Sequence, residues 1–240
     1  MRQLAIPATS FDQRKQLIHT EKPTSAPVQV VEHTPQGTLV ACGTALHQVD
    51  LGRFEIGKKI ARMKAPITSV SLRRDGELAV LSDEKGGVQC SIVSQQTQLK
   101  RLYGLRSAAT VVKFTPDGYS VLAGTKGGEV VVWDLPTGDA TFAVRLCADA
   151  ISDVCFLDGD RAVVSSLGGT LHWINFRLKA IEVGVSEARP CEPVGTFKLH
   201  EKRVADKVTK LALFIKLLFV VAGDFVLLMS PEERKEISRS

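Results

Sequence analysis

The sequence lacks the long hydrophobic run and the catalytic motifs that mark membrane proteins and the common enzyme classes. Its most apolar stretch, residues 208–229, is interrupted by Lys210, Lys216 and Asp224, whereas a bilayer-spanning helix needs about 20 consecutive apolar residues. We therefore expect a soluble core segment and no membrane contact. No G-x-S-x-G occurs, and no two of the five histidines have metal-ligand spacing. The sequence predicts no enzyme, no metal and no cofactor.

Paired cysteine motifs are also absent. The number of cysteines, five, is odd, and no C-x-x-C is present. Three of them, Cys42, Cys90 and Cys155, lie within apolar runs that are typical of strands. Buried free thiols in a reducing compartment are the simplest interpretation.

A phosphate-binding loop is excluded by the stretch GTKGGEVVVWDLPTG (residues 124–138), although it begins with glycines and a lysine. A P-loop places its lysine after the last glycine, between a strand and a helix. Here Lys126 precedes Gly127 and Gly128, and the residues that follow are rich in valine. The stretch therefore predicts the turn of a β-hairpin.

What the sequence does contain is a repeat of about 42 residues. Segments 67–93 and 109–135 align so that Val112 follows Val70 by 42 positions, and Asp117-Gly118 follows Asp75-Gly76 by the same spacing. A third copy spans 151–176, a weaker one 28–51, and a fifth is placed at 208–230. Repeats of this length made of short strands predict four-stranded blades.

The predicted fold is therefore an all-β, WD40-like β-propeller that is divergent and has about five blade equivalents. We expect an N-terminal extension at 1–27, the propeller at 28–230 and a polar tail at 231–240, with an irregular stretch at 176–207. Trp133-Asp134 matches the dipeptide that names WD repeats, and Trp133 is expected to pack between blades. The Gly-His dipeptide of WD repeats is absent, so blade packing should rely more on apolar contacts. Five blades are few for a closed ring, so we expect a neighbouring protein to cover the open side.

Basic residues outnumber acidic ones by 31 to 26, which gives a formal net charge of +5. Several cluster at positions that could face RNA phosphates or an acidic partner, although solvated loop charge is the simpler alternative. Apart from Tyr103, no aromatic residue interleaves with them, so base stacking is not expected. The candidate contacts are Lys58, Lys59, Arg62 and Lys64 in one segment, Arg73 and Arg74 in a turn, and Lys100, Arg101 and Arg106 in a loop between blades.

The copies resemble WD repeats, and residues 26–138 resemble the N-terminal propeller of the U-three small nucleolar RNA-associated protein fifteen family. The resemblance runs through RRDGELAVLSDEKGGVQ and VVKFTPDGYSVLAGTKGGEVVVWDLPTG. It implies a scaffold of the small-subunit processome in the nucleus and nucleolus, acting in pre-rRNA processing and 18S rRNA maturation. The implied partners are other protein subunits, with pre-rRNA or snoRNA contacted indirectly or through basic loops.

A generic WD-repeat adaptor remains the alternative function. Such a protein would act in a trafficking, coat or ubiquitin-ligase assembly, and would lie in the cytoplasm. The repeats alone predict only a propeller scaffold, so the identity of its partners separates the two hypotheses.

Overall fold

The computed structural model describes residues 27–35, 37–50, 55–176, 200–203, 208–214, 217–222, 225–230 and 235–239. All regular structure in these ranges is β-strand, as predicted. The twenty strands are β1 (Val28–Thr34), β2 (Gly37–Cys42), β3 (Ala45–Asp50), β4 (Glu55–Arg62), β5 (Ile67–Leu72), β6 (Leu78–Asp83), β7 (Val88–Ile92), β8 (Thr97–Leu102), β9 (Ala109–Phe114), β10 (Ser120–Thr125), β11 (Glu129–Asp134), β12 (Ala140–Arg145), β13 (Ile151–Phe156), β14 (Arg161–Ser166), β15 (Thr170–Asn175), β16 (His200–Arg203), β17 (Lys210–Phe214), β18 (Leu217–Ala222), β19 (Phe225–Ser230) and β20 (Lys235–Arg239).

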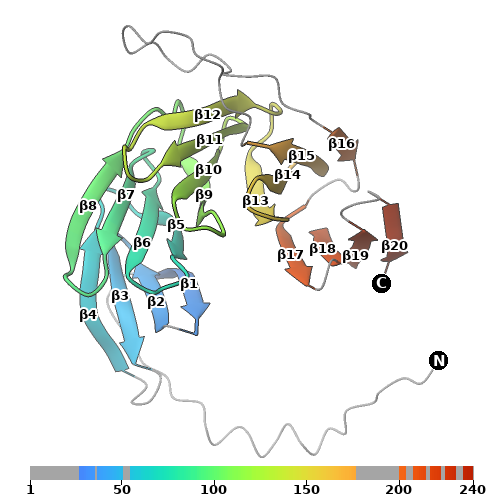
Figure 1. Cartoon of the computed structure of the whole chain (residues 1–240). Helices are drawn as coiled ribbons and strands as arrows, with labels where there is room; N and C mark the ends of the chain where they lie inside the picture. Colours follow the sequence, from blue (N-terminus) through green and yellow to red (C-terminus); the bar gives the residue numbers. More distant parts are fainter. Residues whose placement is uncertain are drawn as a thin grey trace, which may run out of the picture.

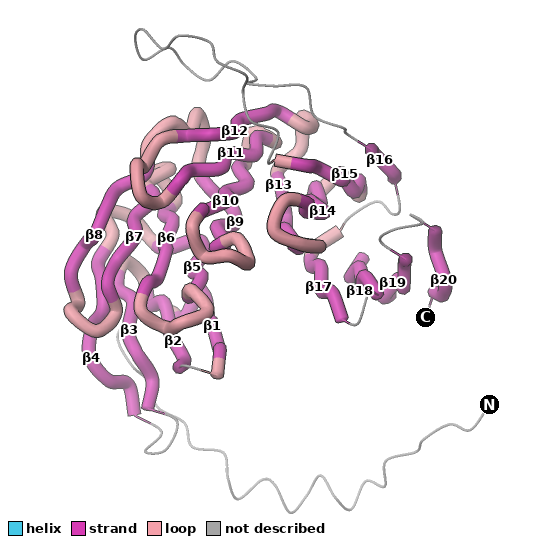
Figure 2. The backbone as a smooth tube through the Cα atoms, viewed as in Figure 1, coloured by secondary structure: helices cyan, strands magenta, loops and turns pink. Residues whose placement is uncertain are grey.

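The strands form five antiparallel sheets of four consecutive strands each: β1–β4, β5–β8, β9–β12, β13–β16 and β17–β20. The sheets follow one another around an arc, with the first strand of each on the inside and the fourth on the outside (Figure 1). Within the described ranges the arc does not close into a ring, and β1–β4 and β17–β20 stand at its two ends (Figure 2). The prediction of propeller blades is thus confirmed.

Recurring turns connect the strands at the two rims of the arc. The β6–β7, β10–β11 and β14–β15 turns each place a glycine at positive φ, namely Gly86, Gly128 and Gly169, with φ between 75° and 83°. Glycine adopts this conformation without the steric cost that a Cβ imposes. The stretch 124–138 is therefore a hairpin, as its sequence predicts. We call the rim that carries these three turns the Gly-Gly rim.

The opposite rim carries the β5–β6, β9–β10 and β13–β14 turns, which contain Asp75-Gly76, Asp117-Gly118 and Asp158-Gly159. The Asp117 carboxylate accepts hydrogen bonds from the Thr115 hydroxyl and from the Tyr119 N–H, at 2.6 and 3.0 Å. Asp side chains that bind nearby backbone stabilise such turns. The aspartate that recurs in these turns therefore has a structural role. We call this edge the Asp-Gly rim.

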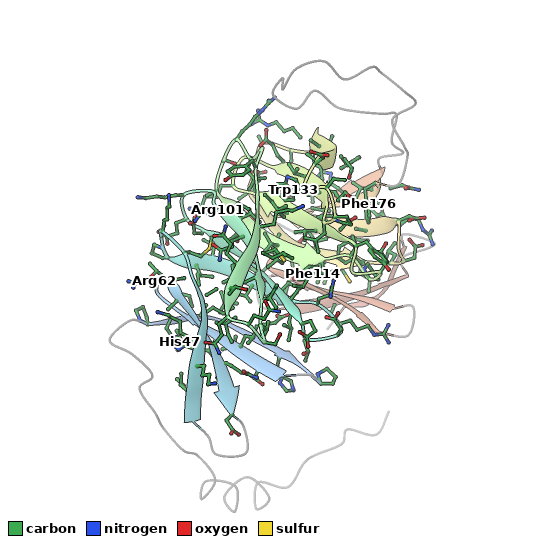
Figure 3. The ribbon with its side chains drawn as sticks, turned by 60° about the vertical axis from the view of Figure 1, so that its left-hand side comes forward. His47, Arg62, Arg101, Phe114, Trp133 and Phe176 are labelled. Carbon is green, nitrogen blue, oxygen red and sulfur yellow. The ribbon has the colours of Figure 1, made fainter. Side chains whose placement is uncertain are left out.

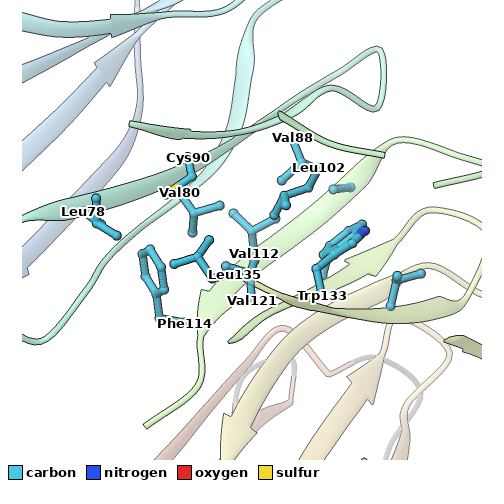
Figure 4. Close-up of a cluster of buried hydrophobic side chains, with 13 residues drawn as sticks. Leu78, Val80, Val88, Cys90, Leu102, Val112, Phe114, Val121, Trp133 and Leu135 are labelled. Carbon is cyan, nitrogen blue, oxygen red and sulfur yellow. The ribbon is translucent and has the colours of Figure 1, made fainter. Parts of the chain in front are cut away.

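Apolar side chains fill the spaces between neighbouring sheets. The cluster between β5–β8 and β9–β12 includes Val80, Val112 and Trp133 (Figure 4). Trp133 is fully buried, and its indole N–H donates to the main-chain carbonyl of Tyr103 at 2.7 Å. The expectation that Trp133 packs between blades is confirmed.

Hydroxyl groups add a polar component to this packing that was not predicted. The Thr68 hydroxyl of β5 donates to the carbonyl of Ala109 on β9 at 2.8 Å, and the Thr110 hydroxyl of β9 donates to the carbonyl of Ile151 on β13 at 2.6 Å. We call these two contacts the hydroxyl bridges. They join the first strands of consecutive sheets, so the prediction of mainly apolar packing was incomplete.

Two strands lie in segments that were expected to be irregular or to form a polar tail. β16 falls within the stretch 176–207 that was predicted to be irregular, and β20 falls within the predicted polar tail, 231–240. β16 pairs with β15, and β20 pairs with β19, as the fourth strands of their sheets. A fourth strand has a neighbour on one side only, so its sequence needs little apolar character. The polar sequences of β16 and β20 are therefore compatible with outer strands.

The tight β10–β11 turn gives the first testable prediction. Gly128 has a φ of 75°, and a Cβ added there would overlap the carbonyl oxygen of Cys147. We expect Gly128→Ala to lower the free energy of unfolding by at least about 2 kcal/mol, because backbone strain and overlap both act. Gly159→Ala is the matched control, since a Cβ there meets nothing within 4 Å. Urea denaturation of both variants measures the difference, and equal stability would contradict the account of this turn.

Candidate functional site

The described part of the chain contains no group of three or more His, Cys, Asp or Glu side chains that could hold a metal ion. Within the same residues, no helix is long and apolar enough to cross a membrane. His172 lies on β15 and is fully buried, which favours a structural role for it. The features that could bind a partner are therefore surface charges and pockets.

The cysteines in the described ranges are free, as predicted. Cys42 and Cys90 are buried, whereas Cys147 and Cys155 are half-buried. Burial raises the pKa of the Cys90 thiol to about 11, against smaller lowering effects that include the charge of Arg73. A thiol with such a pKa is protonated at neutral pH and is a poor nucleophile. Cys191 lies outside the described residues.

The predicted basic residues do not form a single patch. Lys58, Lys59 and Arg62 lie on β4, and Arg73 and Arg74 occupy the β5–β6 turn, as expected. The prediction that Lys100 and Arg101 lie in a loop was wrong, because both belong to β8. An outer strand such as β8 is mostly exposed and charge-rich, so its sequence resembles a loop.

Four of these cations already have partners within the chain. The Arg101 guanidinium donates through Nε to the side-chain oxygen of Gln98 at 3.2 Å. The Lys100 ammonium donates to the carbonyls of Leu135 and Pro136, at 3.2 and 2.7 Å. The Arg73 guanidinium is paired with the Asp75 carboxylate, whose pKa this hydrogen bond lowers. Arg106 lies 3.8 Å from Glu129. These contacts hold turns and neighbouring sheets together, which favours a structural role for Lys100 in particular.

Three of the basic residues lie at pockets of the two rims. Lys58 lines a groove of about 760 Å³ at the Asp-Gly rim, together with Asp50 and Glu77. Lys64 and Arg101 line a pocket of about 270 Å³ at the Gly-Gly rim. In the view of Figure 3, Arg101 lies above Arg62, which belongs to the preceding sheet.

The Gly-Gly rim pocket contains a third cation that the sequence analysis missed. Lys85 of the β6–β7 turn lines it together with Lys64 and Arg101, and Tyr103 borders it. In the sequence, Lys85 stood alone within a turn and gave no sign of a charge cluster. This pocket thus brings together two of the nine predicted residues and adds Lys85.

A second group of charges meets on the inner side of the arc. The Asp153 carboxylate is 2% exposed and accepts a hydrogen bond from the Lys113 ammonium at 2.8 Å. It also accepts the backbone N–H of Val154 at 2.8 Å and that of Leu211 at 3.1 Å. These contacts join β9, β13 and β17, so Asp153 links three consecutive sheets.

Glu32 of β1 faces this charge group from the first sheet. Burial raises the pKa of the Glu32 carboxyl above its usual 4.5. The Leu72 N–H and the ammonium groups of Lys113 and Lys210 act in the opposite direction, and the Asp153 charge raises it further. Burial prevails, so the ionised carboxylate is unfavourable in the folded protein.

Five antiparallel four-stranded sheets arranged in an arc, with repeating turns, have the architecture of WD40-like β-propeller blades. Among curated proteins, the chain is similar to a U3 small nucleolar RNA-associated protein 15 homolog of Xenopus laevis, with 25% identity over 165 residues, or 68% of this chain. It is also similar to U3 small nucleolar RNA-associated protein 15 of Schizosaccharomyces pombe, with 27% identity over 131 residues, or 54% of this chain. The resemblance inferred from the sequence is confirmed.

The match covers only part of those relatives. It spans 32% of the length of the Xenopus laevis protein and 26% of the Schizosaccharomyces pombe protein. A Xenopus tropicalis homolog gives a similar result, with 25% identity over 160 residues and 31% of its length. No family model matches the chain. The comparison therefore concerns about a third or less of each relative, and the activity of a whole relative does not transfer directly.

The raised pKa of Glu32 predicts a pH-dependent effect of its substitution. A carboxyl whose pKa is raised on folding stabilises the protein below the unfolded-state value, 4.5, and this stability is lost as the pH rises through the folded-state pKa. Glutamine keeps the shape and does not ionise. The quantity to compare is the melting temperature of Glu32→Gln minus that of the unsubstituted chain. We expect this difference to be more positive at neutral pH than at about pH 4. A difference in melting temperature that does not change with pH would contradict this interpretation.

Proposed function

We propose that this chain is a non-catalytic WD-repeat scaffold in ribosome biogenesis. It acts in the small-subunit processome, where it supports pre-rRNA processing and 18S rRNA maturation, in the nucleus and nucleolus. The observation that carries the proposal is the shared name of the relatives from two Xenopus species and Schizosaccharomyces pombe, all of which are U3 small nucleolar RNA-associated proteins. Two thirds of this chain matches the first of them.

The structure supports a scaffold in two respects. The five sheets present two rims of short turns, which is the kind of surface that repeat proteins use to bind other macromolecules. Apolar side chains are also exposed at one end of the arc, where Val28 and Val31 of β1 are 49% and 58% exposed. Exposed apolar groups of this kind favour contact with a further protein surface. Other protein subunits are therefore the first partners to seek.

Affinity purification of the tagged chain, with mass spectrometry and RNA sequencing of the bound fraction, tests the proposal. We expect processome proteins, U3 small nucleolar RNA and 5′ pre-rRNA fragments to be enriched over a purification of the tag alone. Depletion of the protein should cause precursors of 18S rRNA to accumulate, while 28S rRNA precursors stay at their normal level.

The alternative adaptor function makes a different prediction for the same experiment. Enrichment of coat, trafficking or ubiquitin-ligase subunits, without U3 RNA or processome proteins, would replace the proposal with that alternative. Normal 18S rRNA maturation after depletion would also count against it.

A further inference from the structure

The Gly-Gly rim pocket lies where three elements of the first two sheets meet. Lys64 follows β4, Lys85 lies in the β6–β7 turn, and Arg101 belongs to β8. The pocket has a volume of about 270 Å³, which is close to the lower limit of ligand pockets, about 300 Å³. It is large enough for one small group and too small for a folded partner.

The charge of the pocket is positive. Lys64, Lys85 and Arg101 line it, and among the described lining residues Asp83 is the only acidic one. Asp83 is 3% exposed, and one of its carboxylate oxygens accepts the N–H groups of Lys85 and Gly87, at 3.0 and 2.8 Å. Part of the Asp83 charge is thus used to hold the turn, and the cations are left to attract an anion.

Lys85 is specific to this blade. The β6–β7 and β10–β11 turns match in their positive-φ glycines, Gly86 and Gly128. The residue before that glycine is Lys85 in the first turn and Gly127 in the second, and the β14–β15 turn has Gly168 at the same place. A Cβ at Gly168 would overlap the Asp149 carboxylate. At this position, therefore, only the β6–β7 turn of these three carries a side chain, and that side chain is cationic. The β10–β11 turn carries its exposed lysine, Lys126, one place earlier.

An exposed aromatic ring borders the same pocket. Tyr103 is 74% exposed, although tyrosine is usually at least half-buried in folded proteins. Its backbone is fixed, because the carbonyl of Tyr103 accepts the indole N–H of the buried Trp133 at 2.7 Å. The ring is thus held at the surface on a rigid support, where its face is available for stacking.

Cations beside an exposed aromatic ring match the chemistry of single-stranded RNA. Phosphates bind Lys and Arg, and unpaired bases stack on tyrosine. An acidic peptide would use the cations but would gain less from Tyr103. A separate pocket at the Asp-Gly rim is lined by Arg73 and Arg74. It offers a weaker site for phosphate, because Asp75 and Asp117 line the same pocket.

We propose that the Gly-Gly rim pocket binds single-stranded RNA, with Lys64, Lys85 and Arg101 contacting one or two adjacent phosphates and Tyr103 stacking on a base. This proposal deepens the proposed function, because it gives the scaffold a direct RNA contact. It also revises the expectation from the sequence that base stacking plays no part.

Binding of the purified full chain to a short fluorescein-labelled oligouridylate, measured by fluorescence anisotropy at several salt concentrations, tests the site. We expect Lys64→Ala, Lys85→Ala and Arg101→Ala each to weaken binding about three- to tenfold. Each should also make the slope of log affinity against log salt concentration less steep by about 0.7. Tyr103→Ala should weaken binding about five- to hundredfold, and Tyr103→Phe should keep most of the affinity. Thermal melts check that each variant is folded.

The matched control is Arg74→Ala, which removes an exposed cation at the opposite rim and should change the affinity less than about twofold. Absence of binding, or binding that none of the pocket variants weakens, would overturn the proposal. It would also be overturned if an oligoglutamate peptide competed fully and Tyr103→Ala had no effect, because the pocket would then bind acidic protein.

Failure of this site and failure of the proposed function give different results. If the chain purifies with processome proteins but does not bind the oligonucleotide, only the RNA site is wrong. If the chain binds the oligonucleotide through the pocket but does not purify with processome components, only the proposed place of action is wrong.

Discussion

The contact between the first strands of consecutive sheets is the constraint on which the rest of the structure depends. Each sheet is only four strands wide and cannot bury both faces by itself. The hydroxyl bridges from Thr68 to Ala109 and from Thr110 to Ile151 fix how one sheet meets the next. Asp153 adds a charged link between three sheets, through Lys113 and the Leu211 N–H. Because these contacts lie on the inner side of the arc, they fix how the second, third, fourth and fifth sheets meet one another.

Once the first strands are fixed, the two rims are free to differ. The Asp-Gly rim repeats the same turn, in which aspartate binds nearby backbone, and its arginines lie beside carboxylates. The Gly-Gly rim has a similar repeating turn, but Lys85 occupies a position that is glycine in the turns of the next two sheets. Trp133 links the packing of the sheets to the surface of the rim. Its side chain packs between two sheets, and its indole N–H holds the backbone of Tyr103 at the rim. A scaffold and a specific surface site are therefore built from the same contacts.

The sequence was sufficient to predict what repeats. The 42-residue spacing of Val70 and Val112 placed the first strands, and the paired glycines placed the turns. It was not sufficient for features that occur once. Asp153 receives an N–H from Leu211, which lies 58 positions further along the chain, and Lys85 joins Lys64 and Arg101 only when three elements meet. The outer strands β16 and β20 were missed because a strand at the edge of a sheet needs no apolar pattern.

The stability of Thr110 variants tests most directly whether hydroxyl bridges hold consecutive sheets together. Thr110→Val keeps the shape and the strand propensity but removes the hydroxyl that donates to Ile151 at 2.6 Å and, within its own sheet, to Gly124 at 3.1 Å. Thr110→Ser keeps the hydroxyl. Urea denaturation should show that the valine variant loses about 1–2 kcal/mol of unfolding free energy, and that the serine variant loses less. A valine variant at least as stable as the unsubstituted chain would contradict the account, because apolar packing alone would then suffice to join the sheets.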